Sequence, residues 1–187
     1  VSYMQRENGV TFLALGLGKT IAEGGKSLRY CPKYPNILSQ FYSIKSSINN
    51  SQNKFYALDL NKGKNPMKNG EKNNLKLFDL NIAENNGELK HLASVVTPDD
   101  NIMRDSLSYK GTRILSFSSI IKYEKNSLNK ILIDLIKKGE KLLGCPIEIE
   151  FALNINDSKI DEFCLLQIKP MTIENYNDHI NINKIRF

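Results

Sequence analysis

Two short segments near the end of the chain carry side chains suited to binding a metal and a phosphate. They read Pro-Ile-Glu-Ile-Glu-Phe-Ala at 146–152 and Phe-Cys-Leu-Leu-Gln-Ile-Lys-Pro-Met at 163–171. Strand side chains alternate between faces, so Glu148 and Glu150 share one face, and Leu165, Gln167 and Lys169 share another. Pairing as a hairpin would bring two carboxylates, an amide and an ammonium onto one surface. Because such oxygens suit Mg²⁺ and a lysine suits a phosphate, the pattern indicates a Mg-nucleotide site.

The pattern EIEFA … LLQIKPM resembles the end of the nucleotide-binding domain of the phosphoenolpyruvate synthase and pyruvate phosphate dikinase family. In that family a glutamate in an IE[FW] strand and a glutamine in an LQxRP segment hold the metal bound to ATP, while the arginine touches the phosphates. The resemblance places Glu150 and Gln167 at the metal positions. It places Lys169 at the arginine position, as a nucleotide contact and catalytic group. Lysine keeps the charge but lacks the rigid two-pronged donor of arginine. The alternative for Glu148 and Glu150 is a solvated strand face.

A second segment, Gly16-Leu-Gly-Lys-Thr20, has the composition of a phosphate loop but not its spacing. A Walker A loop needs a glycine where Leu13 stands, and a dinucleotide loop needs one where Ile21 stands. LGLGKTIAEGG instead resembles the GLGE-x-x-V-x-G segment of phosphoenolpyruvate synthases, with Lys19 where a glutamate is common. The resemblance implies that Gly16, Gly18 and Lys19 lie near the nucleotide. The alternative is a flexible turn after a strand.

The remaining histidines and arginines carry no motif. The family transfers phosphate through a histidine in a T-x-H context on a separate domain, and His91 and His179 do not match it. His91 is therefore expected to be a partly exposed strand histidine. Arg104 and Arg113 are expected to form structural salt bridges.

Length and composition favour one ordinary domain. The chain has 187 residues, 41% of them hydrophobic, and no apolar run long enough to span a membrane. No signal-peptide pattern follows Val1. Three cysteines are too few for a disulfide framework, and their spacing does not suit zinc. Cys145 and Cys164 are expected to be buried, and a reducing, cytoplasmic compartment is predicted.

The net charge of +6 and the isoelectric point near 9.1 admit nucleic-acid binding. The lysines, however, are scattered through polar loops, and no arginine-rich stripe with interleaved aromatic residues is present. We therefore expect neither a nucleic-acid partner nor a membrane partner.

The periodicity of the sequence predicts the elements that must position these residues. The strongest helix is 127–143, with apolar residues at helical spacing, a cap at Asn126 or Ser127, and a stop at Gly144. Leu142 and Leu143 extend its apolar stripe. The other expected elements are a short helix at 38–48, a polar loop at 61–74, a turn at 97–100, and strands at 10–15, 55–60, 75–80, 89–96 and 113–121.

The resemblance covers roughly residues 3–172 and is weakest over 36–85. It implies an α+β, ATP-grasp-like partial domain at 1–172, mostly antiparallel strands with a few helices, followed by a polar tail at 173–187. The chain would then be the ATP- and Mg²⁺-binding part of a phosphotransferase. Its partners would be a missing N-terminal lobe and downstream phosphohistidine and pyruvate-binding domains. The implied reaction moves the β-phosphate of ATP to a histidine, then to pyruvate or a similar acceptor. The alternative is a non-catalytic, degenerate ATP-grasp interaction module.

Overall fold

The computed structural model describes residues 4–60, 74–124, 127–156 and 160–171. The chain divides into two compact units, Val1–Asp134 and Leu135–Phe187. The architecture is α+β, and every strand pairing within the described ranges is antiparallel. The tail predicted at 173–187 lies outside these ranges. None of the helices that the structure describes has the length and apolar character needed to cross a bilayer.

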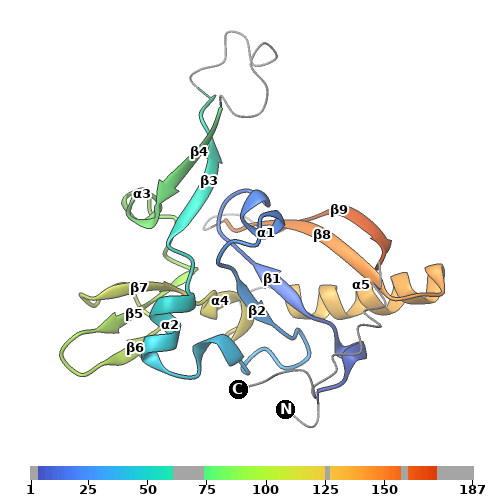
Figure 1. The fold of residues 1–187 in the computed structure, drawn as a ribbon, viewed down its shortest axis with the longest axis horizontal. Helices are drawn as coiled ribbons and strands as arrows, with labels where there is room; N and C mark the ends of the chain where they lie inside the picture. The colour runs from blue at the N-terminus through green and yellow to red at the C-terminus, as the bar shows by residue number, and fades with distance from the viewer. Residues whose placement is uncertain (1–3, 61–73, 125–126, 157–159, 172–187) are drawn as a thin grey trace, which may run out of the picture. The chain divides into compact units, whose positions relative to one another are not determined.

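Unit 1 begins with a small two-stranded sheet. Strand β1 (Thr11–Leu13) pairs with β2 (Leu28–Tyr30), and the single-turn helix α1 (Lys19–Ala22) lies in the connection between them (Figure 1). Leu13, Leu28 and Tyr30 are buried, whereas Phe12 and Arg29 point outward. The strand predicted at 10–15 is therefore present but shorter. The short helical elements of this region are η1 (Arg6–Asn8), η2 (Ser39–Phe41) and α2 (Ile44–Asn50).

A hairpin of β3 (Lys54–Leu58) and β4 (Leu75–Asp79) follows, close to the two strands predicted there. In Figure 1 it extends as a long arm from the rest of unit 1. The rings of Phe55 and Phe78 pack across it with centroids 5.9 Å apart. Most of the loop predicted at 61–74 lies outside the described residues.

The centre of unit 1 is a three-stranded sheet in the order β6-β5-β7. All five residues of the middle strand, β5, are buried, because its neighbours flank it on both sides. Ile114, Leu115, Ile121 and Leu128 are each at most 1% exposed and form the core with it. The elements are α3 (Leu80–Asn85), β5 (Ala93–Thr97), β6 (Ile102–Arg104), β7 (Thr112–Leu115) and α4 (Ser118–Ile121).

Three of the predicted elements around this sheet are wrong in part. The strand predicted at 89–96 begins only at Ala93. Leu89 and Leu92 lie in the turn before it, and their side chains are buried, with 0% and 8% of their surface exposed. The strand predicted at 113–121 ends at Leu115. Phe117 then adopts a left-handed conformation (φ 50°) and α4 starts. The helix predicted at 38–48 is split into η2 and α2.

Helix α5 (Leu128–Leu143) confirms the strongest prediction and runs from unit 1 into unit 2. Leu128 and Leu132 are buried, as the helical spacing indicates, but Leu142 is 84% exposed and does not continue the stripe. The helix ends at Gly144 (φ 68°), whose backbone N–H donates to the carbonyl of Glu140 at 2.8 Å. A positive φ is a conformation that glycine adopts without strain.

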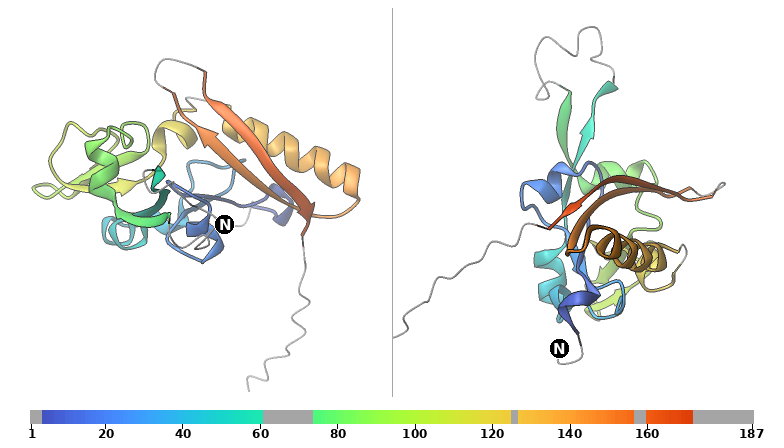
Figure 2. Two further views of the ribbon diagram at one scale, coloured as in Figure 1. Left: turned by 90° about the horizontal axis from the view of Figure 1, so that it is seen from above. Right: turned by 90° about the vertical axis from the view of Figure 1, so that its right-hand side faces the viewer.

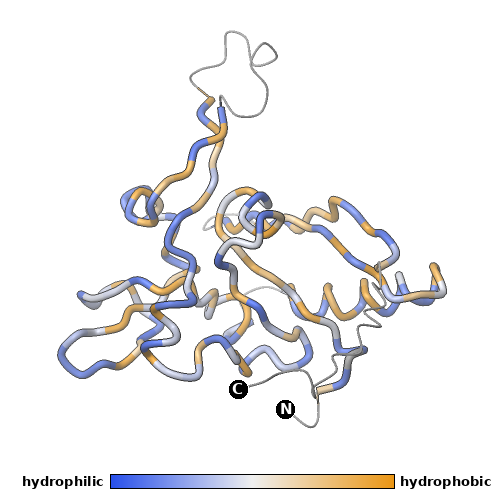
Figure 3. Tube along the Cα trace, viewed as in Figure 1, coloured by the Kyte–Doolittle hydropathy of each residue, from blue (hydrophilic) through white to orange (hydrophobic). Residues whose placement is uncertain are grey.

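Unit 2 combines the second half of α5 with a hairpin of β8 (Ile147–Asn154) and β9 (Glu162–Pro170). The two strands curve over the helix (Figure 2). Hydrophobic and hydrophilic residues alternate along 147–150 and 166–169 (Figure 3), so that this part of the hairpin has one apolar and one polar face.

Candidate functional site

The hairpin brings together the four polar residues that the sequence singled out. Glu148 lies opposite Lys169, and Glu150 lies opposite Gln167 in the antiparallel register. Directly opposite residues share a face of the sheet, with Cβ atoms about 5 Å apart. The predicted hairpin pairing is therefore confirmed.

Helix α5 positions this hairpin through one close contact. A Cβ atom added to Gly139 would lie 2.3 Å from Cδ1 of Ile147 and 2.8 Å from Cδ1 of Ile168. The two isoleucines thus occupy the space that any other residue at 139 would fill. The N–H of Met171 donates to the carbonyl of Pro146 at 2.8 Å and extends the ladder past its last strand pair. Ile147 is thereby buried against the helix, whereas Ile168 on the same face stays 41% exposed.

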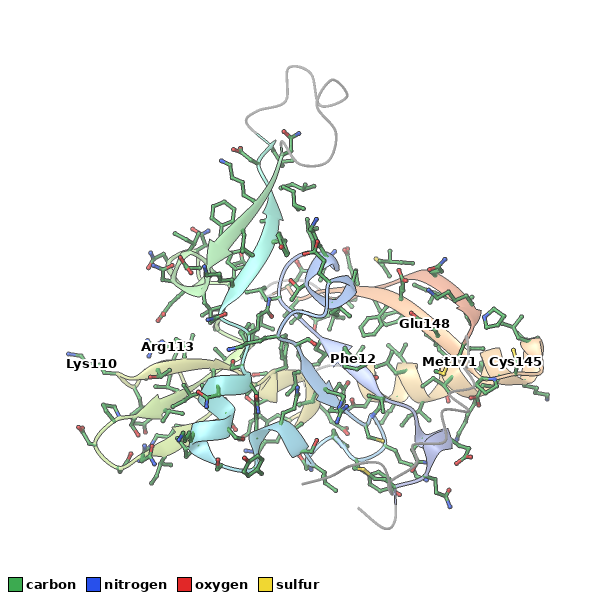
Figure 4. All side chains as sticks on the ribbon, viewed as in Figure 1. Phe12, Lys110, Arg113, Cys145, Glu148 and Met171 are labelled. Carbon is green, nitrogen blue, oxygen red and sulfur yellow. The ribbon has the colours of Figure 1, made fainter. Side chains whose placement is uncertain are left out.

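The charges on the polar face are arranged around Lys169. Its Nζ lies 3.4 Å from Oε1 of Glu148 and 3.7 Å from Oε1 of Glu150, and all three side chains are about half exposed. Figure 4 shows the position of Glu148 on the hairpin. Exposed ion pairs contribute at most about 1 kcal/mol each, so water and incoming ions compete with them easily. The ammonium therefore acts as an exchangeable counter-charge for two carboxylates.

The donor set limits how a metal could be held here. Within the described residues, no group of three or more His, Cys, Asp or Glu side chains could hold a metal ion. Glu150 and Gln167 offer two oxygen ligands, so an octahedral ion would need the others from phosphates and water. Mg²⁺ is commonly bound in this way, through one or two protein ligands plus substrate phosphates. Glu150 and Gln167 alone therefore do not complete the coordination of a metal ion.

The alternation that sequence analysis assumed for the second strand is interrupted. A β-bulge lies between Glu150 and Phe151, and Leu165 stands opposite Phe151. Leu165 is therefore not on the face of Gln167 and Lys169, contrary to prediction. The ring of Phe151 stacks on that of Phe163, with centroids 5.3 Å apart. Because bulges increase twist locally, this one changes the direction of the strand just beyond Glu150 and Gln167.

The glycine segment of unit 1 is held by the neighbouring strand β3. Gly16 has φ 87°, and a Cβ atom there would lie 2.4 Å from the carbonyl oxygen of Tyr56. The N–H of Leu17 donates to that same oxygen at 3.0 Å. Gly18 caps α1 and has open space around it. The structure thus gives Gly16 a packing role, while the nucleotide contacts expected of Gly16 and Gly18 stay predictions.

Lys19 has protein partners in this segment. Its Nζ lies 3.1 Å from Oε1 of Glu23 and 5.6 Å from the ring centroid of Tyr56. The hydroxyl of Tyr56 donates to Glu23 at 3.0 Å. The hydrogen bond from Lys19, followed by that from Tyr56, lowers the pKa of Glu23, and donation to Glu23 raises the pKa of Tyr56. A phosphate at Lys19 would have to compete with this carboxylate.

Arg104 and Arg113 form structural salt bridges, as predicted. Arg113 Nη2 lies 2.6 Å from Oε1 of Glu84, and Arg104 forms an ion pair with Asp100. Hydrogen bonds from Arg104 and then Thr97 hold the pKa of Asp100 well below its usual range. His91 is half-buried in a turn before β5, not on a strand as predicted. His179 lies outside the described residues.

Sequence analysis missed a polar cluster around Asp105. Its carboxylate accepts hydrogen bonds from Ser94 (2.6 Å), Lys122 (2.7 Å) and Tyr123 (2.8 Å), and Ser94 is also hydrogen-bonded to Ser116. Burial opposes ionisation of Asp105, but the hydrogen bonds outweigh it, and the pKa of the carboxyl is lowered. The members are far apart in sequence, so no local pattern marks them.

The cysteines also differ from the prediction. Cys31, Cys145 and Cys164 are free thiols. Cys31 is buried and Cys145 is half-buried, but Cys164 is exposed, which contradicts the expectation for that residue. Cys164 lies in the part of strand β9 that pairs with β8. One side of this strand faces solvent, and the side chain of Cys164 is on that side.

Comparison with models of known protein families, with curated proteins and with solved structures finds no match for this chain.

Proposed function

We propose that this chain binds Mg-ATP through the β8–β9 hairpin, as part of a phosphoenolpyruvate synthase-like phosphotransferase with an ATP-grasp-type nucleotide domain. The observation that carries the proposal is the register of the hairpin. Glu150 stands opposite Gln167, and Lys169 lies two residues further along the same face. The family resemblance assigns the metal to Glu150 and Gln167 and a phosphate to Lys169, and this register supports that proposal by placing the three side chains on one face.

The exchangeable counter-charge fits such a role. Before nucleotide binds, the ammonium of Lys169 balances Glu148 and Glu150. With Mg-ATP bound, the carboxylate of Glu150 would be a ligand of the metal, and Lys169 would be free to contact a phosphate oxygen. Glu148 would stay beside Lys169 and orient it. Each charge exchanges one partner for another, so no charge is left uncompensated.

The chemistry proposed for the whole enzyme needs little more from these residues. Phosphoryl transfer depends on positioning and on neutralising the charge that develops on the phosphates, which Mg²⁺ and Lys169 would supply. The β-phosphate would pass to a histidine on a neighbouring domain, then to pyruvate or a similar acceptor. We place this activity in a reducing, cytoplasmic compartment.

The test is calorimetric titration of Mg-ATP into the chain and into single variants. Glu150→Ala and Gln167→Ala each remove one proposed metal ligand, and each should weaken binding about tenfold or more. Glu162→Gln is the matched control, because Glu162 lies on the same hairpin opposite Asn154, at the far end of the ladder. Equal heats for the wild type, Glu150→Ala and Gln167→Ala would rule out the proposal.

A non-catalytic binding module is the second candidate, favoured by the lysine at position 169. Lysine contacts a phosphate as a point charge and does not provide the paired donors of arginine. Incubating the complete enzyme with Mg²⁺ and ATP labelled at the β-phosphate separates the two. Acid-labile label on a histidine supports the phosphotransferase. Absence of label both in the wild type and in Lys169→Arg, with ATP still bound, supports the module.

A further inference from the structure

An open hollow of about 640 Å³ lies beside β1 and β2 in unit 1. Part of its wall comes from the connection between α1 and β2, and part from the outward faces of the two strands. Its lining includes Phe12, Ile21, Lys26, Ser27, Arg29 and Gln40. No acidic side chain is among the described residues that line it.

Among the residues that the structure describes, the two basic side chains that line this hollow are not neutralised by an ion pair. Lys26 and Arg29 are exposed, and neither has a carboxylate partner within the described residues. Glu23, the only acid between residues 16 and 30, already binds Lys19 and Tyr56. Two cations that face one hollow without a carboxylate create a positive potential there, which attracts an anion. Paired cations elsewhere are Lys19, Lys54, Lys76, Arg104, Arg113, Lys122 and Lys169.

An apolar surface adjoins these cations. Phe12 lies directly opposite Arg29 in the β1–β2 register, so the ring and the guanidinium are neighbours on one face. Phe12 is 45% exposed and Ile21 is 40% exposed. A flat apolar group can pack on the ring, while a charged group attached to it reaches the guanidinium.

The backbone around the hollow is held in place before any ligand binds. Gln40 accepts from the N–H of Arg29 at 2.7 Å and donates to the carbonyl of Ser27 at 3.2 Å. The N–H of Gly25 donates to the carbonyl of Thr20 at 2.7 Å, so that amide is already used. Recognition of an anion therefore falls to the side chains of Lys26 and Arg29, with the hydroxyl of Ser27 between them in sequence. A fixed backbone lowers the entropic cost of binding.

We propose that this hollow binds a small organic anion that carries a carboxylate or phosphate group next to a flat apolar group. Arg29 and Lys26 bind the anionic group, and Phe12 and Ile21 pack against the apolar part. The site needs no metal and uses none of the residues assigned to Mg-ATP. It is therefore a second binding site, independent of the proposed function.

The test is titration of phenyl phosphate into the full chain without divalent cations, followed by amide NMR. Signals of Gly24, Gly25 and Phe12 should shift. Phenyl phosphate should bind about tenfold more tightly than phenol, which lacks the charge, or inorganic phosphate, which lacks the ring. Benzoate in a parallel titration shows whether carboxylate or phosphate is preferred.

Charge-neutralising variants assign the effect to the hollow. Arg29→Gln and Lys26→Gln should each weaken binding about tenfold. Lys110→Gln makes the same change of charge at a position well away from Phe12 (Figure 4) and should leave binding unchanged. All three positions are exposed, so the variants should fold, as their NMR spectra would verify.

Three results would overturn the proposal: no shifts at millimolar phenyl phosphate, equal binding of phenol, or equal weakening in Lys110→Gln. Glu150→Gln should not change this titration. The variants that test binding in the hollow therefore differ from those that test Mg-ATP binding, so either proposal can fail without the other.

Discussion

Lys169 and Lys19 illustrate how one residue type serves different surroundings. Lys169 lies between two half-exposed carboxylates on a strand, where its charge can be exchanged for that of a metal. Lys19 lies on a short helix with one carboxylate and one aromatic ring. The family resemblance indicated both as nucleotide contacts, and Lys169 lies beside the two proposed metal ligands in the hairpin register. The local partners, which the motif does not encode, distinguish the two lysines.

The two glycines of the GLG segment should respond differently to substitution. Gly16→Ala should lower the free energy of unfolding by about 2 kcal/mol or more, because a positive φ and the nearby carbonyl of Tyr56 both resist a Cβ atom. Gly18→Ala, with an ordinary helical φ and open space, should change it by less than about 0.5 kcal/mol. Urea unfolding without nucleotide measures both. Equal effects would contradict the packing role of Gly16.

The Asp105 cluster should make stability depend on pH. The folded pKa of Asp105 is lowered, so its stabilisation is present above its unfolded pKa and is lost as pH falls through the folded value. Asp105→Asn should lower the free energy of unfolding by about 1–3 kcal/mol at neutral pH. The difference from wild type should begin to shrink below about pH 4, where the carboxyl of the unfolded wild-type chain becomes protonated, and should be lost as the pH falls through the lower folded pKa.

Urea unfolding across this pH range measures the effect. Asp99→Asn, the same substitution at an exposed position in the turn before β6, is the control. A constant difference between Asp105→Asn and wild type at all pH values would show that shape, not charge, matters at this position.

At the scale of elements, periodic sequences were predicted well and mixed ones were not. Helix α5 and the β8–β9 pairing follow directly from the spacing of apolar residues in them. The segment 89–96 has the composition of a strand, yet its first residues form a turn whose leucines are buried. Burial of an apolar residue can be satisfied without a regular element, so composition alone could not separate the two. The bulge beyond Glu150 was not predicted: the register passes from Gln167 to Leu165 and leaves Leu166, the second of two adjacent leucines, without an opposite residue.

The contact between α5 and the hairpin is the element-level feature easiest to test. Gly139→Ala should favour the helix by up to about 1 kcal/mol but crowd Ile147, which is only 6% exposed. Overpacking of this kind costs about 1–3 kcal/mol, so net destabilisation is expected. Lys138→Ala, on the neighbouring exposed position, is the control for helix propensity. A stabilised Gly139→Ala would show that the hairpin does not rest on the helix at this point.

At the scale of the whole molecule, the chain is two compact units that share a helix. The boundary between them falls after Asp134, in the middle of α5. Leu128 and Leu132 belong to the core of unit 1, and Gly139 contacts the hairpin of unit 2. The sequence predicted one domain at 1–172. A continuous amphipathic helix gives no sign that its two halves serve different units, so this division could not be read from periodicity.

Breaking the shared helix at its boundary should affect both units. Asp134→Pro removes one backbone hydrogen bond and should cost about 3 kcal/mol or more, whereas Asp134→Ala at the same exposed position should be nearly neutral. Hydrogen exchange at β5 and at β8 reports on each unit separately. Faster exchange at both strands in Asp134→Pro is expected, and loss of protection at only one would show that the units do not depend on a common helix.

The close packing at Gly139 also constrains how this sequence can diverge. The space at this crossing is shared among a glycine and the δ-methyl groups of Ile147 and Ile168. A methyl group gained on the helix must be offset by one lost on a strand, because packed interiors tolerate exchanges that conserve volume better than those that do not. Alanine at 139 becomes acceptable together with valine at 147. These positions should therefore change as a pair during evolution, with neither substitution neutral by itself.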